Sequence, residues 1–232
     1  MGRSTIKDVR TLRALANAPA STPATAAAAA PLDPKSKAAS AQRSSRVAAQ
    51  ASGEIRIIGG QWRRTKLTVL TKPDLRPTPD RVRETLFNWL GQDLAGWRCL
   101  DAFAGTGALG LEAASRGAAQ VRMVETDMQL AGQLKQLVQK LGATNVDITR
   151  GDAIAALQAQ RAHWDVVFID PPFSDTVFAS AVKAAQAAVT DEGYIYLEAP
   201  EAWTNEKLAE YGLVQYRYLK AGAVHAHLLK KL

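Results

Sequence analysis

The sequence predicts an α/β fold: a Rossmann-like, mostly parallel sheet of seven strands, preceded by a β-hairpin and a helix. From residue 98 onward, short apolar runs alternate with longer stretches in which apolar residues recur at helical spacing. Alternating strands and helices are typical of a parallel sheet covered on both faces. The last two strands are separated only by Lys220, Ala221 and Gly222, which leaves no room for a helix. They must therefore form a hairpin, and one edge strand is expected to be antiparallel.

This alternation gives the bounds of the expected elements. The strands are expected at 98–103, 120–125, 146–149, 165–170, 193–198, 213–219 and 223–229. The helices are expected at 107–116, 127–141, 152–160, 175–189 and 201–211.

The segment before the sheet predicts a hairpin and a helix. Two strands, 55–58 and 61–69, flank Gly59 and Gly60, and glycine accepts the positive φ of a tight turn. Thr78 is expected to cap a helix that begins at Pro79 and ends at Gly91. Residues 1–52 are rich in Ala, Ser, Thr and Pro with few large apolar side chains, which predicts a disordered tail. The expected organisation is a tail at 1–52, a hairpin and helix at 53–96, and a catalytic domain at 97–232.

Positive charge is concentrated in the first third of the chain. The formal net charge is +7, made up of +6 over 1–52, +5 over 53–83 and −4 over 84–232. Such a distribution favours a polyanionic partner, since basic side chains release the counterions of phosphates. No apolar run reaches the roughly eighteen residues of a membrane span. Cys99 is the only cysteine, which excludes an intrachain disulfide and fits a reducing compartment.

A glycine-rich motif, Asp101–Gly110, follows the first strand of the sheet and opens a helix. Ligands bind there in open α/β sheets, and Gly105 and Gly107 let the backbone approach a ligand. The spacing of Gly105, Gly107 and Gly110 also matches a dinucleotide fingerprint. Asp101 at the strand end favours another ligand, because its carboxylate repels phosphates and attracts an ammonium. S-adenosylmethionine carries an α-ammonium and no phosphate.

Two further acids follow the next strands. Glu125 ends the second strand and can accept hydrogen bonds from a ribose diol, whereas Asp127 is expected to cap the following helix. Asp152 can accept a hydrogen bond from an adenine amino group while the Ala153 N–H donates to a ring nitrogen. Capping of the next helix is an equally good interpretation of Asp152.

The motif Asp170-Pro171-Pro172-Phe173 ends the fourth strand and indicates the chemistry. The prolines fix φ and remove two N–H donors, so the Asp170 carboxylate and the Pro171 carbonyl remain as rigid acceptors. Two acceptors suit an exocyclic NH₂ group, and Phe173 can stack on the flipped base that carries it. His225 and His227 have no cysteine or carboxylate cluster near them in the sequence, so no metal is expected.

Taken together, these segments resemble the bacterial family of small-subunit rRNA guanine-N2 methyltransferases known as RsmD. The resemblance rests on 55–63, 75–78, 80–90, 103–113 and 170–173, and covers residues 54 to about 230. It implies the class I S-adenosylmethionine-dependent methyltransferase fold with its last strand antiparallel. It also implies S-adenosyl-L-methionine as cofactor and N2 of one guanine in 16S rRNA as target, within an assembled or assembling small ribosomal subunit. A cytoplasmic monomer is expected.

The resemblance also assigns residues to roles. Asp101, Phe103, Gly105 and Gly107 are expected at the methionine end of the cofactor. The full cofactor-binding set is Asp101, Phe103, Ala104, Gly105, Thr106, Gly107, Glu125, Asp152, Ala153 and Asp170. The catalytic set is Asp170, Pro171, Pro172 and Phe173. The residues expected to bind RNA are Arg56, Trp62, Arg63, Arg64, Lys66, Arg76, Arg81 and Arg83. The motifs leave three alternatives open: an adenine-N6 methyltransferase, a nicotinamide-dependent oxidoreductase and a non-catalytic ribosome-assembly factor.

Overall fold

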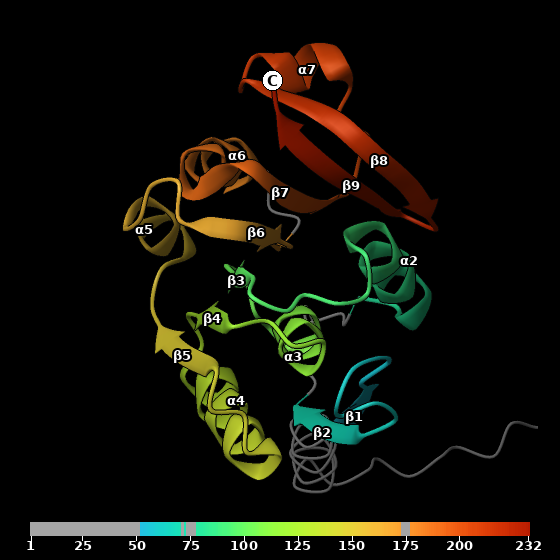
Figure 1. The fold of residues 1–232 in the computed structure, drawn as a ribbon, viewed down its shortest axis with the longest axis vertical. Helices are drawn as coiled ribbons and strands as arrows, with labels where there is room; N and C mark the ends of the chain where they lie inside the picture. Colours follow the sequence, from blue (N-terminus) through green and yellow to red (C-terminus); the bar gives the residue numbers. More distant parts are fainter. Residues whose placement is uncertain (1–51, 71, 73–77, 173–176) are drawn as a thin grey trace, which may run out of the picture. The chain divides into compact units, whose positions relative to one another are not determined.

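A seven-stranded sheet forms the centre of the fold in the computed structural model, which describes residues 52–70, 72, 78–172 and 177–232. Its strand order is β5-β4-β3-β6-β7-β9-β8 (Figure 1). The strands are β3 (Arg98–Asp101), β4 (Gln120–Glu125), β5 (Val146–Arg150), β6 (Trp164–Ile169), β7 (Val189–Ala199), β8 (Leu213–Ala221) and β9 (Val224–Lys231). A separate two-stranded sheet is made by β1 (Ser52–Arg56) and β2 (Lys66–Leu70). The tail expected over 1–52 lies outside the described residues except for Ser52.

The helices that alternate with the strands begin and end close to their expected bounds. They are α2 (Asp80–Leu90), α3 (Ala108–Ser115), α4 (Met128–Leu141), α5 (Ala153–Gln158), α6 (Val177–Ala188) and α7 (Asn205–Ala209). Gly91 ends α2 and Gly142 ends α4, both in the left-handed conformation that glycine adopts without strain. Thr204 caps α7 by accepting from Lys207 N, so the helix begins at Asn205 and is shorter than the expected 201–211.

Helices cover the sheet on both faces, as the alternation predicts. One apolar cluster joins α2, α3, α4 and the β1–β2 hairpin to one face of the sheet. A second cluster joins α5, α6 and α7 to the other face. Strands β3, β4, β5, β6 and β7 pair in parallel, so their carboxyl ends meet along one edge of the sheet. The side chains that end these strands therefore lie near one another.

The antiparallel strand is β9, which is the last strand of the chain. It pairs antiparallel with both β7 and β8. The sequence places the antiparallel strand at the edge, whereas β9 lies one position inside and β8 forms the edge. The chain turns back from β8 into the gap beside β7, where Leu228 and Leu229 are fully buried.

The hairpin before the sheet differs from its prediction. The ladder ends at the pair Arg56–Lys66, and residues 57–65 form a loop instead of a two-glycine turn. Only Gly60 of the two glycines has a positive φ, at 74°. The loop turns away because its backbone N–H groups bond to α3: Gln61 N donates to Ser115 O at 2.7 Å. Trp62, Arg63 and Arg64 consequently lie on this loop and not on a strand.

The start of α2 also differs. Pro79 occupies the N-cap position, and no side-chain cap is present. The hydroxyl of Thr78 donates instead to Asp170 Oδ2, 3.4 Å away. The expected cap is therefore wrong, because a partner 92 residues further along the chain takes the hydroxyl.

Candidate cofactor and base site

The glycine-rich loop lies at the carboxyl end of β3 and is held by its neighbours. Gly105 and Gly107 both have positive φ, 51° and 81°. Gly107 N donates to Ala104 O at 2.7 Å, and Ala104 N donates to Val124 O at 2.9 Å. A Cβ on Gly107 would lie 2.6 Å from Leu134 of α4, so glycine is required there by both conformation and space. The loop is thus a preformed turn.

Within this loop, the part-exposed residues are Phe103 and Gly105, whereas Ala104, Thr106 and Gly107 are buried. Gly110 is needed for packing, because a Cβ there would lie 2.7 Å from Met123. The third glycine of the apparent fingerprint therefore brings α3 close to β4.

Asp101 ends β3 and is 2% exposed. Its Oδ2 accepts a hydrogen bond from Gly110 N at 2.9 Å, at the start of α3. Burial raises the pKa of Asp101 to about 7, and the negative charge of Glu125 acts in the same direction, although the Gly110 N–H opposes it. Asp101 therefore shapes the loop directly, and a cation at the loop would favour its charged form.

Glu125 ties the loop to the next strand. Its Oε2 accepts from Gly105 N at 2.8 Å, and its Oε1 accepts from Asp127 N at 2.8 Å. The side chain is only partly buried, and Oε2 accepts only the Gly105 N–H, so this oxygen keeps a lone pair for a ligand hydroxyl.

The helix caps expected after β4 and β5 are present. Asp127 caps α4 by accepting from Gln129 N and Leu130 N, and Lys72 also pairs with it. Asp152 caps α5 by accepting from Ala155 N at 2.8 Å. Asp152 is exposed and Ala153 is buried. The capping interpretation of Asp152 is thus confirmed, and its contact with adenine remains a prediction.

The Asp-Pro-Pro motif follows β6 at the same edge of the sheet. Asp170 is partly buried, Pro171 is buried and Pro172 is exposed. Phe173, expected to stack on the target base, lies outside the described residues, as does Arg76. Burial raises the pKa of Asp170 well above its ordinary value, and the charges of Glu198 and Asp101 raise it further.

Acidic side chains therefore line this edge at the ends of four strands. Glu125 ends β4, Asp101 ends β3, Asp170 follows β6, and Glu198 is the second-last residue of β7. Carboxyl groups gathered in this way disfavour a pyrophosphate, whereas a cationic ligand would favour their ionised forms. S-adenosylmethionine, with its sulfonium and ammonium groups, fits this residue set, and a dinucleotide does not.

The loop between β1 and β2 carries exposed arginines whose guanidinium groups are accessible to a polyanion. Arg63 and Arg64 are exposed, and within the described part of the chain their guanidinium groups have no ion-pair partner. Arg56 pairs with Asp80 at 3.3 Å and Lys66 with Glu54 at 3.0 Å, and all four side chains are exposed. Surface pairs of this kind are weak, so they can exchange for phosphates. Arg81 is exposed, and Trp62 packs partly against the core.

Arg83 is the exception among the expected RNA-binding residues. It is 1% exposed, and its Nη2 donates to Arg56 O at 3.0 Å while its Nη1 lies 3.5 Å from Glu112 Oε2. A guanidinium buried in this way is not available to phosphate. The expectation for Arg83 is therefore wrong: helical spacing from Val82 and Leu86 did not reveal that its face packs on α3.

Glu112 is a residue that sequence reasoning missed. It is fully buried in α3 and accepts from Ile58 N at 2.8 Å, Gly59 N at 2.7 Å and Arg116 Nε at 2.8 Å. A glutamate inside the otherwise apolar run Leu109–Ala114 was the available signal, since a buried charge requires partners. Glu112 clamps the basic loop onto the helix that begins at the glycine turn.

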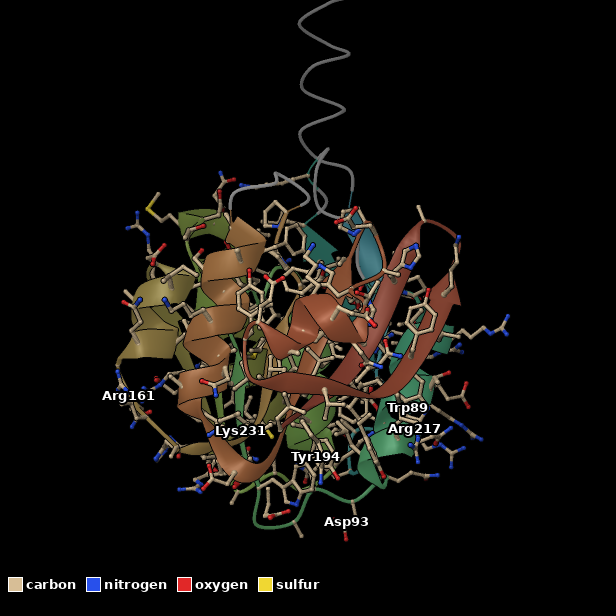
Figure 2. The ribbon with its side chains drawn as sticks, turned by 90° about the horizontal axis from the view of Figure 1, so that it is seen from above. Trp89, Asp93, Arg161, Tyr194, Arg217 and Lys231 are labelled. Atoms are coloured by element: carbon tan, nitrogen blue, oxygen red, sulfur yellow. The ribbon has the colours of Figure 1, made fainter. Side chains whose placement is uncertain are left out.

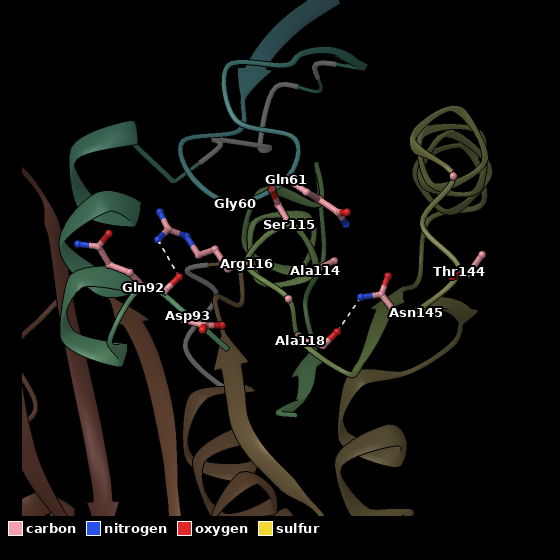
Figure 3. A pocket seen from close by; sticks show the side chains of 12 residues that line it. Gly60, Gln61, Gln92, Asp93, Ala114, Ser115, Arg116, Ala118, Thr144 and Asn145 are labelled. Carbon is pink, nitrogen blue, oxygen red and sulfur yellow. Dashed lines mark hydrogen bonds between the residues drawn. The ribbon is translucent and has the colours of Figure 1, made fainter. Parts of the chain in front are cut away.

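A pocket of about 540 Å³ lies at the opposite edge of the sheet. Figure 3 shows its lining, which includes Gln61, Gln92, Arg116, Thr144 and Asn145. These residues belong to the 57–65 loop and to segments that precede β3, β4 and β5. The pocket therefore lies at the amino ends of the strands, away from Asp101 and Asp170, and is not the site assembled above.

A group of aromatic and basic side chains also lies on the β7–β9–β8 part of the sheet. Lys230 Nζ is 4.9 Å from the Tyr194 ring centroid, and the Arg217 guanidinium lies 4.1 Å above Tyr216. Figure 2 labels two members of this group, Tyr194 and Arg217. Tyr194 stacks on Trp97, which precedes β3, so this group too is at the amino ends of the strands.

The remaining candidates have structural roles. His227 is buried and bonds Gln215 Oε1 at 2.9 Å, and burial lowers its pKa to about 4. Burial likewise raises the pKa of the Cys99 thiol. Across the described ranges, no cluster of three or more potential metal ligands occurs. None of the helices described is both long and apolar enough to cross a bilayer.

Fold and site together define a class I methyltransferase. A solved structure described as a putative methyltransferase from Escherichia coli superposes with a TM-score of 0.65 and 40% identity, covering 77% of this chain and 98% of that one. A Thermus thermophilus 16S rRNA N2 methyltransferase, solved with S-adenosylmethionine and guanosine, superposes with a TM-score of 0.63 at 23% identity. It covers 78% of this chain and 50% of its own, and at that identity supports the fold alone.

The chain belongs to the family described as Conserved hypothetical protein 95, whose family model matches residues 55–230. Curated relatives are named ribosomal RNA small subunit methyltransferase D. The Escherichia coli protein is 41% identical over 177 residues, covering 72% of this chain and 89% of the relative. The Haemophilus influenzae protein is 40% identical over 181 residues, covering 72% and 94%.

Proposed function

We propose that this protein transfers a methyl group from S-adenosyl-L-methionine to the exocyclic N2 amine of one guanine in small-subunit (16S) ribosomal RNA. The observation that carries the proposal is the acidic edge formed by Asp101, Glu125 and Asp170 beside a preformed glycine turn. The names of the Escherichia coli and Haemophilus influenzae relatives, both small-subunit rRNA methyltransferases, support the substrate class.

Each residue of the edge has a distinct task in this proposal. Asp101 and the turn from Phe103 to Gly107 hold the ammonium end of the cofactor, and Glu125 accepts from the ribose. Asp152 and Ala153 contact the adenine. When bound, the cofactor supplies an electrophilic methyl group on its sulfonium.

Asp170 and Pro171 act on the nucleophile. The lone pair of an exocyclic amine is delocalised into the base, which makes the nitrogen a poor nucleophile. Two fixed acceptors that take both amine hydrogens return electron density to nitrogen and aim it at the methyl group. Positioning and local electrostatics thus supply the catalysis without a strong base. The base is flipped out of its stack, and Phe173 stacks on it.

The segment 53–96 serves as an RNA-binding extension of the catalytic domain 97–232. Arg63, Arg64 and Arg81 contact phosphates, and Arg56 and Lys66 join them by exchanging their surface partners. The assembled or assembling small subunit is the substrate, and the protein acts in the cytoplasm as a monomer.

The variant Asp170→Ala tests the proposal. It should lower methyl transfer to purified small subunits by at least about 100-fold, because one of the two acceptors is removed. The dissociation constant for S-adenosylmethionine, measured by calorimetry, should change less than about threefold. Asp191→Ala, at an exposed carboxylate near the start of β7, is the matched control. Full transfer by Asp170→Ala, or binding of NAD in preference to S-adenosylmethionine, would refute the proposal.

A further inference from the structure

Three aromatic rings and two cations lie together outside the base site, on the β7–β9–β8 part of the sheet. The Trp97 and Tyr194 rings are stacked, with centroids 6.0 Å apart and planes at 7°. The Tyr216 centroid lies 5.7 Å from that of Tyr194. Lys230 Nζ is 4.9 Å from the Tyr194 centroid and 5.6 Å from the Tyr216 centroid, and the Arg217 guanidinium lies 4.1 Å above Tyr216. We call these five residues the aromatic platform.

A β-bulge in the edge strand β8 builds the platform. The pairing of β8 with β9 shifts between Gln215 and Arg217, which leaves Tyr216 as an extra residue. In a regular strand, Tyr216 and Arg217 would point to opposite faces of the sheet. The bulge brings them together instead, so the guanidinium covers the ring and its Nη1 donates to Tyr216 O at 2.9 Å. Bulges are typical of places where a strand re-aims a side chain.

The outer side of the platform is open to solvent. Arg217 is exposed and Tyr216 is 40% exposed. One plane of the guanidinium faces the Tyr216 ring, so the other plane faces away from it. Among the described residues, the polar contacts of Arg217 are with Tyr216 alone, which leaves its charge unpaired. Lys230 pairs with Glu192 at 4.0 Å, but Glu192 is 98% exposed, so this weak pair can exchange for a phosphate.

The charge of this part of the chain indicates the kind of partner. Residues 211–232 include no acid, whereas 84–232 as a whole carries −4. The basic residues of 211–232 are Arg217, Lys220, Lys230 and Lys231. The β8–β9 hairpin is therefore a basic unit on an acidic body, which favours an anionic ligand. Unpaired bases stack on aromatic rings and on arginine planes, whereas a duplex offers no free base plane along its length. Single-stranded RNA meets both conditions.

The platform lies near enough to the base site for one RNA molecule to reach both. Tyr194 and Glu198 lie on the same face of β7, because side chains two residues apart in a strand share a face. Four residues of strand span about 13 Å. Glu198 is one of the acids at the carboxyl edge, where Asp170 follows β6. The platform is therefore suited to nucleotides that flank the target base.

We propose that the aromatic platform binds unpaired nucleotides of the RNA substrate, an inference that rests on the proposed function for the identity of that RNA. One base stacks on the outer plane of the Arg217 guanidinium, which Tyr216 supports from beneath. Lys230 contacts a neighbouring phosphate after it releases Glu192. The platform is a second RNA contact, separate from the segment 53–96, and it selects single-stranded RNA by stacking.

Photocross-linking locates the RNA without any methyl transfer. The full-length protein is irradiated with an oligouridylate that contains 4-thiouridine, and the modified tryptic peptides are identified by mass spectrometry. Cross-links are expected in 208–217, the peptide that holds Tyr216. Tyr218, in the separate peptide 218–220, is the internal control: it is also 40% exposed, but it packs on His227, which accepts from Trp203 N on the other face of the sheet. Cross-links confined to 1–83, or equally frequent in 218–220, would overturn the inference.

Substitution of Arg217 then separates stacking from charge. Arg217→Lys keeps the charge and removes the plane, so the oligouridylate concentration that half-saturates the cross-link in 208–217 should rise about fivefold or more. The slope of log affinity against log salt should stay unchanged in Arg217→Lys and fall by about 0.7 in Arg217→Ala. Tyr218→Ala should bind as the wild-type protein does. Wild-type binding by Arg217→Lys, or an equal loss in Tyr218→Ala, would contradict a stacking role.

Kinetics with small subunits separate this inference from the proposed function. Arg217→Lys should raise KM for small subunits, because the platform holds RNA away from the reacting atoms. A wild-type protein that cross-links as expected but transfers no methyl group contradicts the proposed function and leaves the platform in place. Wild-type transfer with the same KM in Arg217→Lys overturns the platform alone. So does a dimer, measured by sedimentation without RNA, that Tyr216→Ala abolishes, because the rings would then bind a second copy of the chain.

Discussion

Replacing Gly60 by alanine should detach the basic loop from α3. A Cβ at Gly60 would overlap the carbonyl oxygen of Ser115, a backbone atom that cannot turn aside, and φ is +74°. Three hydrogen bonds hold this contact: Gln61 N to Ser115 O at 2.7 Å, Ser115 Oγ to Gly59 O at 2.6 Å, and Trp62 N to Ser115 Oγ at 3.0 Å. At about 1 kcal/mol each, their loss costs about 3 kcal/mol. Strain at positive φ adds about 1 kcal/mol.

Denaturant unfolding measures the total, about 4 kcal/mol for Gly60→Ala. Gly222→Ala is the matched control, because Gly222 has a φ of +62° and open space where its Cβ would be. The control should cost about 1 kcal/mol, the strain alone. Free-energy losses for the two variants that agree within about 0.5 kcal/mol would show that the loop does not depend on its contact with Ser115.

Three further predictions concern buried and exposed charges. Glu112→Gln should reduce the free energy of unfolding by about 3–5 kcal/mol, because Arg83 and Arg116 lose their buried counter-charge. The exposed Glu84→Gln should leave the free energy of unfolding almost unchanged. A loss below about 1 kcal/mol for Glu112→Gln would show that Glu112 does not hold the loop on α3. Burial raises the pKa of Asp101 to about 7, so the fold favours its protonated form, and the stability this gives is lost as the pH rises from the ordinary aspartate pKa to about 7. An ammonium beside Asp101 should reverse this, so S-adenosylmethionine binding at pH 6 should release nearly one proton; calorimetry that gives the same heat in buffers of different ionisation enthalpy would exclude that contact. Arg63→Ala should reduce the slope of log affinity for rRNA against log salt by about 0.7–0.9, whereas the exposed Arg161→Ala should leave the slope unchanged; equal slopes for the two would place the RNA elsewhere.

The carboxyl edge of the sheet could be predicted from sequence because parallel pairing decides it. Once Asp101, Glu125 and Asp170 each follow a strand of an alternating α/β pattern, the topology gathers them along one edge. The glycine turn follows in the same way, since its positive φ values are local requirements of Gly105 and Gly107. Local pattern and tertiary structure agree at these positions.

The remainder could not be predicted because distant partners decide it. The loop at 57–65 leaves its ladder for Glu112 and Ser115, more than 50 residues away, and Thr78 turns to Asp170 instead of capping α2. Sequence alone predicts an exposed Arg83, whereas the side chain is buried against α3. Glu198 lies in an apolar strand where sequence alone offers no partner. In each case a hydrogen bond or ion pair with a distant buried group replaces the contact that neighbouring residues predict.

In the proposed reaction, two fixed acceptors after β6 present a guanine amine to a methyl donor. Nucleoside mass spectrometry tests it most directly, on small-subunit rRNA incubated with S-adenosylmethionine and either wild-type protein or Asp170→Ala. N2-methylguanosine is expected from the wild-type protein only. N6-methyladenosine as the product, or N2-methylguanosine formed equally well by the variant, would contradict it.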